Sequence, residues 1–202
     1  MNIAIPKYKE IARAETLGVE NLALDLASVK EHLRLDSSDA SDDDYLNGLI
    51  KSVSNDFEEI TNRFLIATTF KTCREFFQKI FELRRANFQS VENIKYYDIS
   101  GTLQTVASSN YNVSDAYPYA STVFKSVFQY PILEDEKPQP IEIEFKAGYG
   151  DTYVNIPQDV RMALKNMVLY LYENRGDCSS GNYPDAYKKT IMKYKIKSFG
   201  GC

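Results

Sequence analysis

The sequence predicts an α+β protein in which two long amphipathic helices pack together, with a short N-terminal helix, a β-rich middle region and an extended C-terminal tail. Residues 42–64 and 157–175 each carry an uninterrupted apolar stripe at helical spacing. Residues 67–150 are rich in Thr, Val, Ile, Tyr and Phe, and turn residues interrupt them at short intervals. Because the two stripes lie at opposite ends of the chain, we expect the β region to be an excursion from the helix pair.

The composition excludes several classes of protein. Of the 202 residues, 44% are hydrophobic and 26% are charged, as in globular domains rather than in disordered chains or coiled-coil rods. No apolar run approaches the ~20 residues that a membrane helix needs, and we expect no secretory signal in residues 1–9. Three Cys are too few for a disulfide framework, and a single His leaves little basis for metal or acid–base chemistry.

The chain is expected to divide into an arm, a main domain and a tail. Each predicted helix has a start or stop signal, and the β region has its own turn signals, so the boundaries can be placed. The expected ranges are an N-terminal arm at 1–21, a main domain at 22–176 with helices at 26–35, 42–64 and 157–175 and the β-rich region at 67–150, and a C-terminal tail at 177–202.

Capping residues and apolar spacing support the first two helices. Asp25 can cap the first free N–H groups of the short helix, in which Leu26 and Val29 fall on one stripe. Ser41 is a suitable N-cap for the first long helix, and residues 42–44 are Asp, which the helix dipole favours in the first turn. The apolar stripe of that helix is Leu46, Leu49, Ile50, Val53, Phe57, Ile60 and Phe64.

Local signals also define the β region and the last long helix. Residues 98–101 form an Asp-Ile-Ser-Gly step that predicts a hairpin turn. Residues 141–146 alternate strictly between apolar and polar side chains, which predicts a strand with one buried face. Pro157 suits the first position of the following helix, and Gly176 suits the position after its end.

The charge is distributed unevenly along the chain, although the net charge is only −4. Residues 36–59 contain eight acids and one base, and residues 183–202 contain five Lys and one acid. Blocks of opposite sign are typical of contacts between subunits or between the ends of a chain. Two solvated faces would explain the same pattern.

The basic tail is the best candidate for a docking segment, because it places apolar residues among its Lys. We expect it to leave the helical core and to dock on a neighbouring molecule, with the acidic block as a counter-surface. A nucleic-acid-binding role through Lys and aromatic side chains remains an alternative. The candidate docking residues are Lys188, Lys189, Ile191, Lys193, Tyr194, Lys195, Ile196 and Phe199, and the candidate counter-surface is Asp42, Asp43, Asp44, Glu58 and Glu59.

No residue pattern supports catalysis, a cofactor site or a metal site. His32 has no nucleophile motif beside it, and Glu142 and Glu144 share the polar face of the alternating strand. Successive Asp residues at 42–44 point about 100° apart on a helix, so they cannot converge on one ion. We therefore expect a non-enzymatic protein without a cofactor, and a hydrolase remains an alternative.

Five segments together resemble the head–tail connector, or head-completion adaptor, proteins of long-tailed bacteriophages. They occur in order, with the spacing of that family, over about residues 24–199. One departure is Asn62, which stands where the family has Gly. The segments are Leu26–Asp36, Asp42–Arg63, Ser90–Val113, Phe145–Arg175 and Met192–Ile196.

The resemblance implies a structural role. Members of that family form a ring of about a dozen subunits beneath the portal protein, extend the DNA channel and offer a docking surface to a stopper or tail-completion protein. DNA passes through without specific binding, no membrane is involved, and no covalent chemistry is performed. The resemblance also implies a location at the head–tail junction of the virion, with assembly in the cytoplasm of the host bacterium.

Two physical features agree with that role. A ring needs a heterologous interface, and the acidic and basic blocks provide two unlike patches. A DNA channel must avoid binding phosphate tightly, and a chain with net charge −4 avoids it when it is repeated around a ring.

Overall fold

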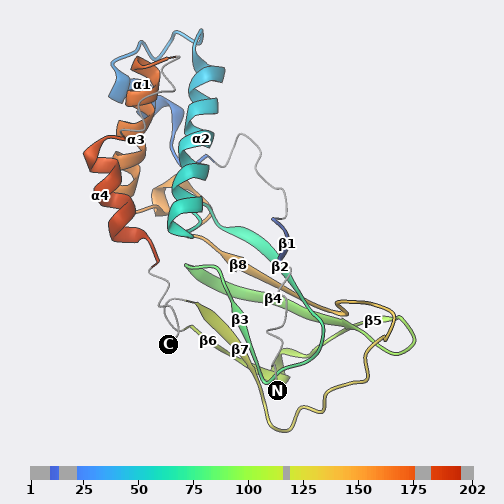
Figure 1. Cartoon of the computed structure of the whole chain (residues 1–202). Coiled ribbons are helices and arrows are strands. Elements are labelled where there is room, and N and C mark those ends of the chain that lie inside the picture. Colours follow the sequence, from blue (N-terminus) through green and yellow to red (C-terminus); the bar gives the residue numbers. More distant parts are fainter. Residues whose placement is uncertain (1–9, 14–21, 116–118, 176–182, 197–202) are drawn as a thin grey trace. The chain divides into compact units, whose positions relative to one another are not determined.

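The computed structural model describes residues 10–13, 22–115, 119–175 and 183–196, which form two compact units (Figure 1). The β unit contains the described part of residues 68–147 together with strand β1 (Glu10–Arg13). The helical unit contains the described parts of residues 16–67 and 148–202. Apart from β1, the predicted arm at 1–21 lies outside the described residues.

The predicted architecture is wrong. The described residues form four α-helices and two antiparallel sheets in a mixed α+β arrangement, rather than a helix pair with a β excursion and an extended tail. The β region is a compact unit with its own buried residues, among them Phe81 and Phe124. Within the predicted tail, helix α4 (Asp185–Tyr194) buries Tyr187 and Ile191, because these residues share one face of the helix.

Left-handed residues end the first two helices before the predicted ends at 35 and 64. Helix α1 (Leu26–Leu33) begins at Asp25, whose carboxylate accepts the Ser28 N–H at 2.9 Å. It ends at Arg34, which has a φ of 59°. Helix α2 (Asp43–Thr61) has Asp42 as its N-cap and ends at Asn62, with a φ of 55°. A left-handed residue cannot continue the helix, so the apolar residues that follow lie beyond each helix end.

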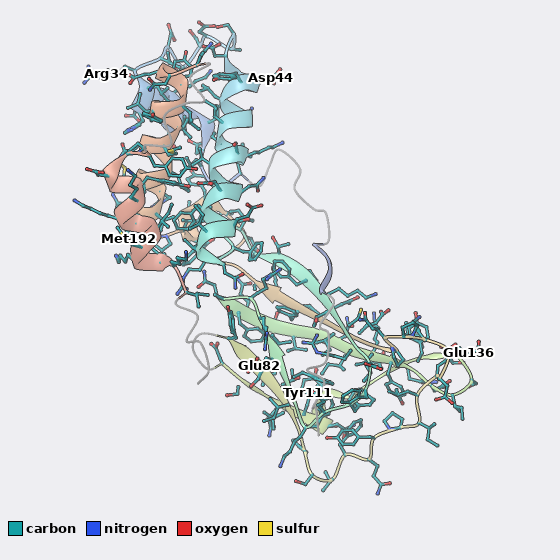
Figure 2. All side chains as sticks on the ribbon, in the orientation of Figure 1. Arg34, Asp44, Glu82, Tyr111, Glu136 and Met192 are labelled. Atoms are coloured by element: carbon teal, nitrogen blue, oxygen red, sulfur yellow. The ribbon has the colours of Figure 1, made fainter. Side chains whose placement is uncertain are left out.

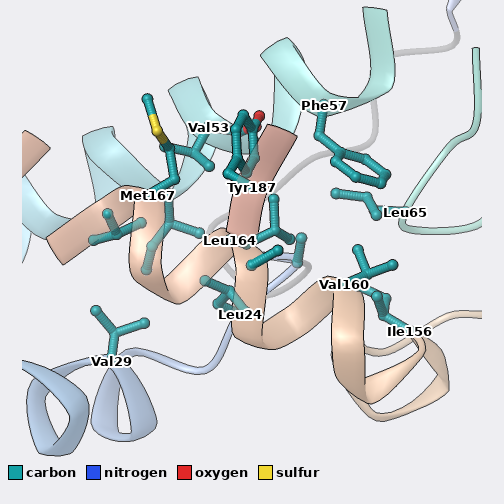
Figure 3. Packing of buried hydrophobic residues seen from close by; sticks show 14 of the residues in the cluster. Leu24, Val29, Val53, Phe57, Leu65, Ile156, Val160, Leu164, Met167 and Tyr187 are labelled. Atoms are coloured by element: carbon teal, nitrogen blue, oxygen red, sulfur yellow. The ribbon is translucent and has the colours of Figure 1, made fainter. Parts of the chain in front are cut away.

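The helical unit is held together by apolar side chains from all four of its described helices (Figure 3). Helix α3 (Gln158–Glu173) packs against α2 and α4 and buries Val160, Leu164 and Met167. Val53 and Phe57 of α2 and Tyr187 of α4 belong to the same cluster. Because fully burying one such side chain stabilises the fold by about 1.5–3 kcal/mol, this shared core ties α4 to its own chain.

A close backbone contact within the helical unit joins two segments that are far apart in the sequence. Ala67 donates its N–H to the carbonyl of Gly150 at 2.8 Å. Gly148 has a φ of 140°, and a Cβ at this position would lie 2.5 Å from the Cα of Ala67. Only glycine fits both the conformation and the space.

The β unit contains two antiparallel sheets (Figure 1). The five-stranded sheet has the order β1–β2–β8–β4–β5, with β2 at Thr68–Arg74, β8 at Ile141–Ala147, β4 at Phe88–Tyr97 and β5 at Leu103–Thr105. The three-stranded sheet has the order β3–β7–β6, with β3 at Ile80–Leu83, β7 at Ala120–Phe124 and β6 at Tyr111–Ser114. Short 3-10 helices occur at Ser108–Asn110 (η2) and Tyr153–Asn155 (η3), the latter in the helical unit.

Strand β8 occupies the centre of the larger sheet. Its residues alternate between buried and half-buried, as its sequence pattern indicates. Phe145 lies opposite Phe70 of β2, with ring centroids 5.7 Å apart. In the smaller sheet, Phe124 of β7 contacts the rings of Phe81 and Phe128.

Candidate docking surfaces

Helix α4 has one face turned into the helical unit and one turned outward. Tyr187 and Ile191 are buried, whereas Lys189, Met192 and Lys195 are exposed. Figure 2 labels Met192 on this helix. The outward side of α4 is therefore an apolar residue flanked by Lys, and we call Lys189, Met192 and Lys195 the α4 outward face.

Polar contacts reinforce the packing of α4. The Tyr187 hydroxyl donates to Oδ2 of Asp56 on α2 at 2.8 Å. Lys193 and Tyr194 donate to the Asp159 carboxylate of α3 at 2.6 and 2.9 Å. The hydrogen bond from Lys193, followed by that from Tyr194, holds the pKa of Asp159 below its usual value against the opposing effect of burial. Burial, together with the hydrogen bond to Asp56, raises the pKa of Tyr187.

The candidate docking residues of the tail differ in how far the structure buries them. The apolar members Ile191 and Ile196 are buried in the chain's own helical unit, and Tyr194 is half-buried. Lys188 is half-buried, and Phe199 lies outside the described residues. The exposed members are Lys189, Lys193 and Lys195. Docking of these Lys on another molecule stays a prediction.

The candidate acidic counter-surface is largely engaged within the chain. Asp42 accepts hydrogen bonds from the Tyr172 hydroxyl at 2.5 Å and from Arg175 at 2.9 Å, and both contacts lower the pKa of its carboxyl. Asp43 forms an ion pair with the buried Lys30.

The remaining acids of that surface are scattered along α2. Glu58 is buried, and its Oε1 accepts the Leu65 N–H at 2.8 Å. Asp44 and Glu59 are exposed, but 15 positions of helix separate them by about 22 Å. They do not form one patch.

The catalytic candidates have structural contacts. His32 contacts Oδ1 of Asn166 through Nε2 at 3.1 Å, a bond between α1 and α3. Glu142 forms an ion pair with Lys71 at 2.6 Å across the β2–β8 pair. Glu144 accepts from Asn93 at 2.7 Å. Each contact cross-links neighbouring elements of one unit.

The described residues show neither a metal cluster nor a membrane-spanning helix. No three side chains of His, Cys, Asp or Glu are grouped there so that they could hold a metal ion. In the same part of the chain, no helix is both long and apolar enough to cross a membrane.

The turn between β4 and β5 presents an exposed apolar side chain on a rigid frame. The Asp98 carboxylate accepts hydrogen bonds from the Ser100 and Thr102 N–H groups and from the side chains of Ser100 and Gln104. These bonds, led by those from the Ser100 and Gln104 side chains, lower the pKa of Asp98 to about 2. Ile99, at the tip of this turn, is 69% exposed.

A second loop of the β unit is bonded to this turn. Asp98 bridges Leu133 in antiparallel fashion, and Tyr97 bonds to the backbone of Glu134 and Pro140. Next to the bridge, Ile132 is 71% exposed. The turn at 98–101 was predicted from its sequence, but the exposed loop at 130–140 was not identified as a surface. Its three Pro residues among apolar and acidic residues were the available signal.

The loop at 130–140 borders a surface groove of about 440 Å³. Apolar residues of the groove include Phe76 and Tyr130, both about half exposed, and Ile132. Its charged residues are Glu75, Glu134, Asp135 and Lys137. Figure 2 labels Glu136, the next acid of this loop. We call this feature the acidic groove.

Comparison with known proteins shows a similarity to one family. Residues 23–120, just under half of the chain, match the family of phage gp6-like head-tail connector proteins. This match confirms the resemblance that the sequence motifs indicate. Over these residues the chain is similar to the head–tail connector class, and the role that this similarity indicates is argued below as a proposal. Among proteins with curated functions, none matches it.

Solved structures of gene transfer agent particles share the fold. A chain in the neck of the empty particle, computed with C6 symmetry, is 21% identical; the match covers 96% of this chain and 98% of that chain with a TM-score of 0.75. A chain in the virion of the native particle is 20% identical, with the same coverage and TM-score. A chain in the neck of the native particle, computed with C12 symmetry, is 20% identical over 95% and 99% of the two chains, with a TM-score of 0.72.

Proposed function

We propose that this connector forms a ring of about twelve subunits at the head–tail junction, between the portal protein and a stopper or tail-completion protein. The observation that carries the proposal is the fold match over nearly the full length of both chains to a neck protein in a structure with C12 symmetry. A closed ring requires each subunit to present two different surfaces to its neighbours. The α4 outward face and the acidic groove are two such surfaces in this chain.

The ring extends the DNA channel without binding DNA tightly. Each Lys or Arg that contacts a phosphate adds affinity, and a protein with net charge −4 limits that effect. Tyr187 and Tyr194 of the basic segment do not favour a nucleic-acid-binding role. Tyr187 is buried, and the rings of both Tyr187 and Tyr194 pack against Phe57, so they are not available for stacking on bases.

The role is non-enzymatic. His32, Glu142 and Glu144 hold neighbouring elements together through the contacts described above, which accounts for them without chemistry. The protein acts through its surfaces, on its own copies, on the portal protein and on the stopper, and it needs no cofactor for that. Assembly takes place in the cytoplasm of the bacterial host.

Assembly of particles tests the proposal. Particles made without this protein should be DNA-containing heads that lack tails, and the wild-type protein should restore tailed particles. A variant with His32→Gln, Glu142→Gln and Glu144→Gln should restore them as well, once its folding is verified. Tailed, infectious particles in the complete absence of the protein would refute the connector role, and failure of the folded triple variant would refute the non-enzymatic role.

A further inference from the structure

Two exposed surfaces of the chain carry opposite charges, and each also exposes an apolar side chain. The α4 outward face places Met192, 65% exposed, between Lys189 and Lys195. Lys189 and Met192 are three positions apart on α4, so they lie together on its surface, and Lys195 follows directly at the end of the helix. Met is an adaptable apolar side chain that suits a docking contact.

The acidic groove carries the opposite charge. It combines exposed apolar side chains with three carboxylates and one Lys. That Lys, Lys137, lies over the ring of Tyr97 at 3.1 Å from its centroid, so its charge is directed at the aromatic face. The carboxylates of Glu75, Glu134 and Asp135 therefore dominate the charge of the groove.

Backbone hydrogen bonds and ring stacking hold the loop that borders the groove in place. The loop that carries Ile132 is bonded to the end of β4 through Tyr97 and through the bridge between Asp98 and Leu133. Tyr130 stacks on Phe77 with ring centroids 5.5 Å apart. A surface already ordered before binding loses less conformational entropy when a partner docks.

The acids of the helical unit do not provide an equal receptor. Asp42, Asp43 and Glu58 are engaged within their own chain, and Asp44 and Glu59 lie far apart. A basic, apolar-centred patch therefore finds its best match in the acidic groove.

We propose that the α4 outward face of one subunit docks into the acidic groove of the neighbouring subunit. This inference rests on the proposed ring, because a contact between two unlike patches is heterologous and closes on itself only around a ring. Met192 supplies the apolar anchor beside Ile132, and the Lys residues steer the approach. The contact should weaken with salt, since the charges at its rim are exposed.

Disulfide trapping tests the contact directly. Both test chains carry Cys178→Ser and Cys202→Ser, and Cys73 is buried. One chain then carries Met192→Cys and the other Ile132→Cys. After mild oxidation of the mixture, we expect a covalent dimer. A matched pair with Lys51→Cys, on the exposed side of α2, in place of Met192→Cys should give only background.

The double variant with Met192→Cys and Ile132→Cys in one chain separates contacts between chains from contacts within a chain. The proposal predicts a ladder of covalent oligomers. A monomer with an internal disulfide, or no dimer above the Lys51→Cys background, overturns it.

Charge reversal gives an independent test. Lys189→Glu with Lys195→Glu should reduce self-association at least tenfold, measured by sedimentation, and the matched control Lys51→Glu should not. Adding Glu134→Lys and Asp135→Lys should restore much of the association. If Lys189→Glu with Lys195→Glu keeps the wild-type melting temperature and loses no self-association, the proposal is refuted.

The same samples, mixed with portal protein, are imaged by electron microscopy to separate this inference from the proposed function. Rings in which the Met192→Cys and Ile132→Cys pair forms no disulfide, or rings that persist after charge reversal, overturn only the α4–groove contact. Absence of rings and of portal binding in the wild-type protein overturns both.

Discussion

The hydroxyl of Tyr187 on α4 donates a 2.8 Å hydrogen bond to Oδ2 of Asp56 on α2, across 131 positions of sequence. The ring of Tyr187 is buried and lies 6.4 Å from that of Phe57. This one side chain fixes a basic segment to the helical core and leaves only its outward face for partners.

Removing that hydroxyl should destabilise the helical unit. In Tyr187→Phe the buried ring stays, but the hydrogen bond to the carboxylate is lost, which costs about 1.5–3 kcal/mol. Urea denaturation followed by circular dichroism measures the loss. Tyr183→Phe is the matched control, because its hydroxyl lies 3.5 Å from Asp56 and should matter less. Equal effects of the two changes would contradict the assigned role of Tyr187.

Alkaline pH should weaken the protein partly through the same residue. Burial, with the hydrogen bond to Asp56, raises the pKa of Tyr187 in the folded state above the ordinary tyrosine pKa of about 10. A raised folded pKa contributes stability that is fully present below about pH 10 and is lost as the pH rises further. The free energy of unfolding should therefore fall less steeply above about pH 10 in Tyr187→Phe than in the wild type. Identical slopes would show that Tyr187 does not titrate differently in the two states.

Neighbouring residues of α4 should differ sharply in their contribution to stability. Ile191 is buried and Met192 is exposed, although they are adjacent. Ile191→Ala should cost about 2–5 kcal/mol, and Met192→Ala should stay within about 0.5 kcal/mol of the wild type. Chemical denaturation of both variants measures the difference. A small loss of stability in Ile191→Ala would show that α4 is not packed into the helical core.

Acid should loosen the turn between β4 and β5 only at very low pH. Four hydrogen bonds to the Asp98 carboxylate lower its pKa to about 2. A depressed folded pKa gives stability that is present above the unfolded pKa and is lost as the pH falls through about 2. Titration of the Asp98 side chain by NMR should give a midpoint clearly below that of an ordinary Asp. A midpoint near 3.9 would show that the turn is open in solution.

Local signals in the sequence define much of the secondary structure. The alternation in 141–146 marks β8, and the apolar stripe of α2 marks its buried residues Leu46, Ile50, Val53 and Phe57. The helix ends were misplaced because Arg34 and Asn62 take left-handed conformations, which residues other than glycine adopt only in a suitable context.

The tail was misinterpreted for a related reason. Lys residues surround Tyr187 and Ile191, and they mask a pair at i and i+4 that identifies a buried helix face. The partners of that face, Asp56 and Phe57, lie about 130 positions earlier in the chain, so local spacing alone could not reveal them.

The count of acidic residues at 36–59 was also an insufficient guide to a docking surface, because partners distant in sequence bind some of these acids. Asp42 is bonded to Tyr172 and Arg175, and Asp43 to Lys30, so their charges are satisfied within the chain. A charge excess in sequence becomes a docking surface only where the fold leaves the carboxylates exposed and close together. The acidic groove brings together acids from separate segments, the exposed Glu75 and Asp135 and the half-buried Glu134.

Electron microscopy of the purified protein, alone and mixed with the portal protein of the same particle, tests the connector assignment most directly. The assignment predicts closed rings around a central channel, with about twelve subunits, a number that agrees with the C12 symmetry of the neck that holds the matched chain. A protein that remains monomeric in both samples and does not bind portal would contradict it.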